Sequence, residues 1–157
     1  MEETFYLCGK NRRMINQFVQ YLMSKDGVMI EEIKDDTVCF QRNGYNYVFL
    51  SNKNDPNYYR VILPNIFNLE KNTFVDLLDV LKETNLLNQL YKAVKVVAVD
   101  EKNVWILLEQ FAYTNHSSEL YRLFDRSLSV HEEIFNRFKD FLIKKKREKE
   151  EAEEQQQ

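Results

Sequence analysis

Few side chains in this 157-residue chain could carry out acid–base or nucleophilic chemistry. They include three pairs of adjacent carboxylates, at Glu31-Glu32, Asp35-Asp36 and Glu132-Glu133. A hydrolase or transferase needs a nucleophile beside a base, or two carboxylates that converge on one substrate atom. Adjacent residues point to opposite faces of a strand and lie about 100° apart around a helix, and Asp35-Asp36 is typical of a turn. We therefore expect all three pairs on solvated surface and predict no catalytic residue.

The two histidines, His116 and His131, begin no metal-ligand pattern such as HExxH. His131 falls on the apolar stripe of a predicted helix, where a buried histidine satisfied by one hydrogen bond is favoured over a ligand or a base. An interface position is a second interpretation of His131, and His116 is expected in a loop or a helix cap. We predict no metal site. An enzyme with an unrecognised site stays an alternative, and its mark would be a deep pocket that holds a histidine beside a carboxylate.

Glycines and cysteines exclude further classes of site. The three glycines, at positions 9, 27 and 44, form no GxGxxG or Walker loop, so we expect no nucleotide and no other cofactor. Cys8 and Cys39 are too few for a disulfide scaffold and favour free thiols in a reducing compartment. The N-terminal region lacks the continuous apolar stretch of a signal peptide or membrane span. A cytoplasmic location without membrane attachment is the expectation.

Composition indicates an ordered globular chain, with 44% hydrophobic and 13% aromatic residues and only 3 glycines. The formal net charge of -3 gives the body no electrostatic attraction for a polyanion, so nucleic acid is a disfavoured partner. One domain of this length can bury a core without disulfides or metals.

The sequence predicts one helix followed by strands in the first half of the chain. Apolar residues recur at helical spacing until Asp26-Gly27, and this predicts a helix that buries Met14, Ile15, Phe18, Tyr21 and Leu22. From Val28 to Leu63, runs of β-branched and aromatic residues alternate with turn signals, including the polar stretch Asn52 to Asn57, and predict four antiparallel strands.

Asn43-Gly44 is the strongest turn signal, since a two-residue type I′ loop needs positive φ at both positions. This turn sets the register of the flanking strands. The predicted opposite pairs are Arg42 with Tyr45, Phe40 with Tyr47, Val38 with Phe49, and Cys39 with Val48. Cys39 is then a packed strand residue and not a nucleophile.

The second half adds a helix, a hairpin and a long helix. After Pro64, a capping box at Thr73 and Asp76 predicts a leucine-rich helix to Leu90, with a possible break near Thr84-Asn85. A hairpin of residues 94–99 and 104–111, joined by the four-residue loop 100–103, precedes a helix that begins near Ser117. The order is α-ββββ-α-ββ-α, an α+β fold with an antiparallel sheet. We predict a single domain over 1–143 and a charged helical extension or disordered tail over 144–157.

Both faces of the second hairpin are apolar. A four-residue loop sets Val99 opposite Val104 and Val97 opposite Ile106, and leaves a second face of Val94, Val96, Ala98, Trp105 and Leu107. A peripheral antiparallel strand normally has one polar face, so two apolar faces must be covered from both sides. The three helices could supply both covers. The alternative is that a second subunit or a client covers the face of those five residues, with Trp105 as the anchor.

A second functional hypothesis is single-stranded RNA binding by an aromatic sheet face. The segment Asn43 to Leu50 resembles the aromatic RNP1 strand of RNA-recognition domains, and Tyr45, Tyr47, Tyr58 and Tyr59 could stack on bases. The first position of the segment is asparagine where a basic residue should meet phosphate, and the strand comes from a meander. A packed hairpin is the favoured interpretation.

Two short motifs and the element order carry a family resemblance. The motifs are Gly44-x-x-Tyr47-Val48 followed by Asp55 to Asn65 (DPNYYRVILPN), and Val94-Lys95-Val96 followed by Asn103-Val104-Trp105. From Asn11 to Lys144 the chain resembles the bacterial YbjN-like group within the type III secretion chaperone-like fold. The resemblance implies no catalytic residues. It implies a small acidic homodimer that holds a client protein in a chaperone-like or regulatory role.

Overall fold

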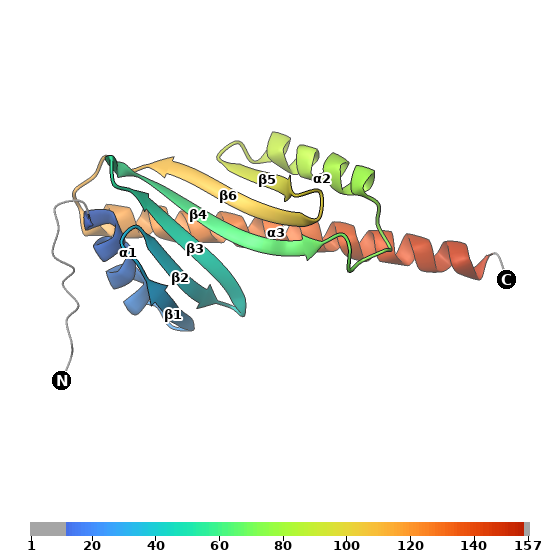
Figure 1. Ribbon diagram of the computed structural model, residues 1–157, viewed down its shortest axis with the longest axis horizontal. Coiled ribbons are helices and arrows are strands. Elements are labelled where there is room, and N and C mark those ends of the chain that lie inside the picture. Colours follow the sequence, from blue (N-terminus) through green and yellow to red (C-terminus); the bar gives the residue numbers. More distant parts are fainter. Residues whose placement is uncertain (1–11, 156–157) are drawn as a thin grey trace. The chain divides into compact units, whose positions relative to one another are not determined.

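The computed structural model describes residues 12–155 and shows an α+β fold in the predicted element order (Figure 1). The elements are α1 (Arg13–Met23), β1 (Val28–Ile33), β2 (Thr37–Arg42), β3 (Tyr45–Asn52), β4 (Asp55–Asn68), α2 (Leu77–Leu90), β5 (Val94–Val99), β6 (Asn103–Phe111) and α3 (Ser117–Glu154). The predicted fold class is confirmed. Contacts divide the described chain into two compact units, residues 12–63 with 108–128 and residues 64–107 with 129–155. The single domain predicted over 1–143 stays a prediction.

The six strands form one sheet in the order β1-β2-β3-β4-β6-β5, and the pairs β1–β2, β2–β3 and β3–β4 are antiparallel. All four residue pairs predicted across the β2–β3 turn are present in the register. Asn43 and Gly44 take φ values of 53° and 80°, as the predicted type I′ turn requires. Cys39 is half-buried opposite Val48, within strand β2.

β4 differs from the prediction at both ends. It begins at Asp55, which pairs with Asn52 in β3, so the polar stretch Asn52 to Asn57 contains only a two-residue turn at 53–54. It also continues through Pro64 to Asn68 where the prediction ended at Leu63. A proline lacks the N–H group, and a strand tolerates it only where no ladder bond is needed from that group.

In the first unit, α1 and residues 117–128 of α3 supply an aromatic core. Phe18, which is fully buried, stacks on Phe49 with ring centroids 3.8 Å apart and meets the edge of Phe124 at 5.0 Å. The five α1 residues predicted to be buried are buried. Tyr21 donates a hydrogen bond to Asp125 Oδ1 at 2.7 Å, and Lys25 pairs with the same carboxylate at 2.9 Å. These contacts tie α1 to the start of α3.

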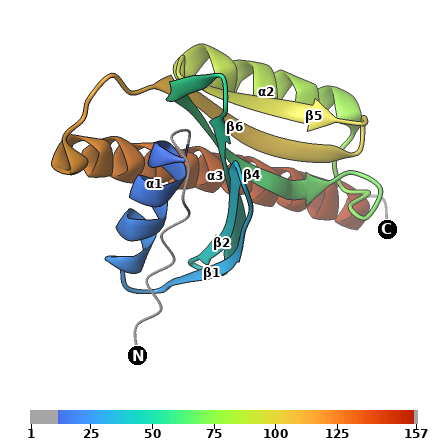
Figure 2. The same ribbon diagram turned by 60° about the vertical axis from the view of Figure 1, so that its left-hand side comes forward.

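In the second unit, Figure 2 shows α2 and α3 on one side of β5, β6 and the end of β4. The predicted start of α2 is wrong, because Asp76 is itself the N-cap and accepts from the Asp79 amide at 2.8 Å. The helix runs unbroken through Thr84, whose hydroxyl donates to the Leu81 carbonyl. Phe67 of β4 meets Phe138 of α3 at 6.0 Å between ring centroids.

Asn88 of α2 fastens the edge strand β5. Its side-chain amide donates to the Val96 carbonyl at 2.9 Å, and its side-chain oxygen accepts from the Val96 amide at 2.7 Å. The Asn88 carboxamide thus forms hydrogen bonds with both backbone groups of Val96 at the open edge of the sheet, as a neighbouring strand would. Unpaired strand edges are templates for pairing with other chains.

We expect Asn88→Ala to lower the free energy of unfolding by about 1–3 kcal/mol, since it leaves both backbone groups of Val96 without these partners. Urea unfolding followed by circular dichroism measures the change. Gln89→Ala is the matched control, because Gln89 is exposed on the same helix and should cost less than about 0.5 kcal/mol. Equal midpoints for the two variants would show that the Asn88 contacts contribute nothing.

The charged segment that begins at Lys144 is helical to Glu154. The long helix starts at Ser117 as predicted. In the described part of the chain, no helix is long and apolar enough to cross a membrane. Cys8 lies outside the described residues, so the prediction of a free thiol there concerns a part of the chain that the structure leaves undescribed.

Candidate functional site

The predicted partner contact lies on the β5–β6 hairpin, whose loop is shorter than predicted. β5 ends at Val99 and β6 begins at Asn103, so three residues form the loop in place of four. Asp100 and Glu101 take left-handed φ values of 58° and 55°, and the Lys102 amide donates to the Val99 carbonyl at 3.2 Å. A shift of one residue turns side chains to the other face of a strand. The faces of this hairpin therefore follow from burial and not from the predicted loop.

Burial separates the five residues predicted as partner contacts. Val94 and Val96 are each 2% exposed and belong to the core, so they offer no surface to a partner. Ala98, Trp105 and Leu107 are half-buried. The structure thus brings Val94 and Val96 into the core. Ala98 shares their face of β5, so only Trp105 and Leu107 of the five lie on the side away from the core.

The half-buried residues Val97, Val99, Trp105 and Leu107 form what we call the Trp105 surface. They alternate along their strands with the buried residues Val96, Val104 and Ile106, so they lie on the side of the hairpin away from the core. The sequence prediction missed Val97 and Val99 in this role, because the loop length that decides their side was wrong by one residue.

Trp105 is held in place by a polar contact. Its indole N–H donates to Asn65 Oδ1 at 3.0 Å. Asn65 has a φ of 53°, a left-handed conformation that asparagine adopts more readily than most residues. The ring is therefore already oriented in the unbound protein, so less side-chain entropy would be lost on binding a partner.

The residues considered for catalysis are scattered over the structure. His131 is fully buried, whereas His116 is exposed and its carbonyl accepts from the Glu119 and Leu120 amides at the start of α3. Among the carboxylate pairs, Asp35 forms an ion pair with Arg12, and Glu31 and Glu32 are exposed. The described residues contain no group of three or more metal-ligating side chains.

The aromatic residues proposed for RNA stacking are divided between core and surface. Tyr47 and Tyr59 are 1% and 0% exposed, so they cannot stack on a base in the folded protein. Tyr45 and Tyr58 are half-buried. The largely exposed rings are instead Phe111 and Tyr113, which stack with centroids 6.2 Å apart. The sequence prediction did not single out this pair.

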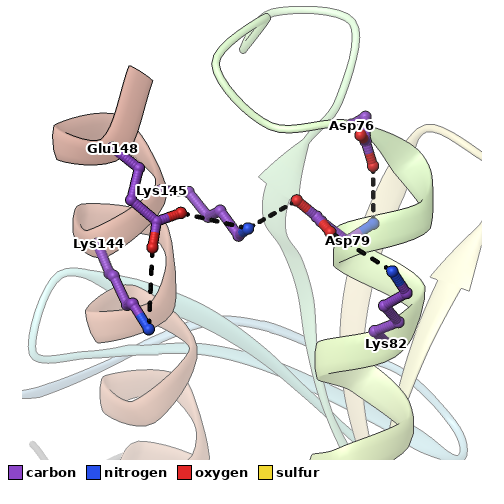
Figure 3. Close-up of polar contacts among 6 residues, drawn as sticks. All are labelled: Asp76, Asp79, Lys82, Lys144, Lys145 and Glu148. Carbon is purple, nitrogen blue, oxygen red and sulfur yellow. Dashed lines mark hydrogen bonds and ion pairs between the residues drawn. The ribbon is translucent and has the colours of Figure 1, made fainter. Parts of the chain in front are cut away.

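A polar cluster joins α2 to α3 within the second unit (Figure 3). Lys145 Nζ lies 2.8 Å from Asp79 Oδ2 and 3.3 Å from Glu148 Oε2. The hydrogen bond from Lys145 lowers the pKa of Asp79, and the same contact raises the pKa of Lys145. Lys149 donates to the Thr73 carbonyl at 3.1 Å, which extends the attachment along α3.

An open groove of about 360 Å³ lies beside this cluster, between α2 and α3. Its lining comprises Glu83, Leu86, Leu87 and Leu90 from α2 and Arg137, Asp140, Phe141 and Lys144 from α3. Leu86 is 47% and Leu90 57% exposed. Partial burial raises the pKa of Glu83, and the charge of Lys144 opposes that effect. The groove has an apolar floor and charges of both signs, and no histidine lines it.

The comparisons with known proteins assign no family. No family model and no curated protein matches the sequence. Among solved structures, the chain is similar to the crystal structure of an uncharacterized protein from Methanothermobacter thermautotrophicus. That likeness has a TM-score of 0.49 at 10% sequence identity, and it covers 80% of this chain and 99% of the other. The resemblance to the YbjN-like group therefore stays a prediction.

Proposed function

We propose that this protein is a non-enzymatic protein-binding module, chaperone-like or regulatory, that works as a homodimer. Its partner contact is the Trp105 surface. The observation that carries the proposal is the placement of Trp105, half-buried on the outer side of the hairpin with its N–H group already bound to Asn65. Tryptophan, with tyrosine and arginine, is enriched among the residues that dominate binding near the centres of protein interfaces.

The surroundings of Trp105 support a protein partner. Val97, Val99 and Leu107 add half-buried aliphatic area to the same side of the hairpin as Trp105. The burial of Tyr47 and Tyr59 removes half of the rings on which base stacking would depend. The net charge of -3 likewise favours a protein over a polyanion.

Affinity purification at native abundance, read by quantitative mass spectrometry, tests the proposal. We expect Trp105→Asp to reduce recovery of the specific partner at least about 30-fold, since truncating a central interface tryptophan costs about 2 kcal/mol or more. Phe111→Asp is the matched control, because Phe111 is an aromatic residue of the same strand that is 54% exposed. It should leave recovery unchanged.

Two outcomes of this experiment count against the proposal. One is a wild-type protein that recovers no specific partner, and the other is a partner recovered equally by wild type and Trp105→Asp. Trp105→Phe distinguishes the contribution of the aromatic ring to partner binding from that of the hydrogen bond, since phenylalanine keeps a ring but cannot donate to Asn65. Circular dichroism of each variant checks that the fold is intact.

A further inference from the structure

The outer face of α3 carries a regular row of charges. Arg137, Asp140, Lys144, Arg147 and Glu151 follow one another at helical spacing of three and four, with Ile143 beside them, and all six are exposed. We call this set the α3 stripe. Ile143 is 51% exposed, an apolar side chain in the middle of a charged row. The stripe adjoins the α2–α3 groove, since Arg137, Asp140 and Lys144 also line that groove.

Several charges of the α3 stripe have no partner within the described part of the chain. Two charges of the stripe are engaged within their own helix, Lys144 with Glu148 and Arg137 with Glu133, each at 3.8 Å. Beside the stripe, Lys145 pairs with Asp79 at 2.8 Å. In contrast, Asp140, Arg147 and Glu151 form no side-chain hydrogen bond or ion pair with any described residue. Asp140 and Arg147 are seven positions apart, so they are too far apart on the helix to pair with each other.

The order of four of these five charges is self-complementary, and the fifth, Lys144, is already paired with Glu148 of its own helix. Arg137 and Glu151 lie at equal distances on either side of Lys144, and Asp140 and Arg147 lie symmetrically about the Ile143–Lys144 bond. The two midpoints differ by half a residue, which is under about 1 Å along a helix. A two-fold axis at Ile143–Lys144 would set Asp140 opposite Arg147 of a second copy, and Arg137 opposite Glu151 of that copy. Each pair would then occur twice, as an isologous interface requires.

We propose that the α3 stripe and the adjoining α2–α3 groove form the homodimer interface, with α3 antiparallel to α3 of a second copy. This inference rests on the homodimer in the proposed function and names its contact surface. The charge pairs set the register, while Ile143, Leu86 and Leu90 supply apolar area that is exposed in one copy. The methylene stem of Arg147 from the second copy can cover the leucines of the groove.

The attachment of α3 to the rest of its unit makes the stripe a rigid surface. The ion pair of Lys145 with Asp79 and the hydrogen bond from Lys149 to Thr73 hold this part of α3 against α2 and the segment before it. An antiparallel partner therefore meets an ordered helix and does not have to order one. The contact shares no residue with the Trp105 surface, since none of that surface's residues belongs to the stripe or the groove.

Sedimentation velocity on the full chain from about 1 to 200 µM, at low ionic strength, tests the interface. Wild type should form a dimer whose dissociation constant rises with added salt. Asp140→Arg and Arg147→Glu should each raise the dissociation constant at least about 10-fold. Each change sets two like charges opposite each other, and the two-fold symmetry makes this repulsive contact occur twice. The double variant carrying both changes should restore the wild-type value. Lys146→Glu, a charge reversal of an exposed residue on the same helix, should have little effect.

Every outcome is informative. A wild type that stays monomeric at 200 µM overturns the inference, and so does a dimer that the single reversals do not weaken or that the double variant does not restore. Partner recovery separates this failure from failure of the proposed function. If Arg147→Glu is monomeric yet recovers the partner as wild type does, the interface is right and dimerisation is not needed for binding. If Trp105→Asp loses the partner and stays dimeric, the two surfaces act independently.

Discussion

Replacing Phe18 with alanine is expected to lower the free energy of unfolding by about 3–5 kcal/mol, the range for deleting a fully buried phenylalanine ring. Phe18 is 0% exposed and is the hub of the first unit's aromatic core. Its ring lies 3.8 Å from Phe49, 5.4 Å from Phe40 and 5.0 Å from Phe124, measured between centroids. The cavity left by alanine would remove contacts to two strands and to α3 at once. Urea unfolding at neutral pH measures the loss.

Met23→Ala is the control for Phe18→Ala, because Met23 belongs to the same helix but is 76% exposed. It should change the free energy of unfolding by less than about 0.5 kcal/mol. A loss below about 1 kcal/mol for Phe18→Ala would contradict the packing described for α1.

Tyr59 is expected to make folding sensitive to alkaline pH. Burial raises the pKa of its hydroxyl from 10.0 to about 12, although the hydrogen bond shared with Ser127 acts in the opposite direction. The hydroxyls of Tyr59 and Ser127 lie 3.0 Å apart in a buried position. Because the folded-state pKa exceeds the unfolded one, the contribution is complete below pH 10 and is lost as the pH rises through about 12. The expected loss is about 2 kcal/mol at pH 12, since each pKa unit corresponds to about 1.4 kcal/mol.

Comparison with Tyr59→Phe isolates this titration from that of the other tyrosines and lysines. Between pH 9 and pH 12, the free energy of unfolding of wild type should fall by about 2 kcal/mol relative to that of Tyr59→Phe. A difference between wild type and Tyr59→Phe that is constant with pH would show that Tyr59 does not ionise differently in the two states.

The register of the β2–β3 hairpin could be predicted from the sequence, whereas that of the β5–β6 hairpin could not. The difference lies in the residue types of the two turns. Asn43-Gly44 carries its turn chemistry in its side chains, and the register of β2 with β3 follows from it. The second turn places Asp100 and Glu101 in left-handed conformations, and glutamate, unlike aspartate, is not a residue type enriched in that region. The resulting one-residue error assigned Val94 and Val96 to the wrong side, although the apolar character of both faces was evident.

Helix α2 illustrates a second limit. Thr73 and Asp76 have the spacing of a capping box, but the helix begins at Leu77, so Asp76 is the N-cap and Thr73 lies before the helix. The Thr73 carbonyl accepts a hydrogen bond from Lys149, 76 residues later. A contact between residues so far apart in sequence cannot be deduced from local spacing.

The α3 stripe shows what neither composition nor periodicity could supply. Mixed charges after Lys144 indicate a solvated helix, and the segment is helical. That Asp140 and Arg147 have no partner among residues 12–155 follows only from where α2 and its lysines and carboxylates lie. The sequence predicts the surface type, and the fold decides which charges are left to meet another molecule.

Trp105 also permits the most direct test of the central claim, since it is the only tryptophan in the chain. Biosynthetic 5-fluorotryptophan gives a single fluorine resonance that reports on the Trp105 surface alone. We predict that this resonance shifts, and becomes less sensitive to solvent isotope, when the protein recovered by wild type but not by Trp105→Asp is added back. An unchanged resonance in a complex verified by sedimentation would contradict the assignment of the Trp105 surface as the partner contact.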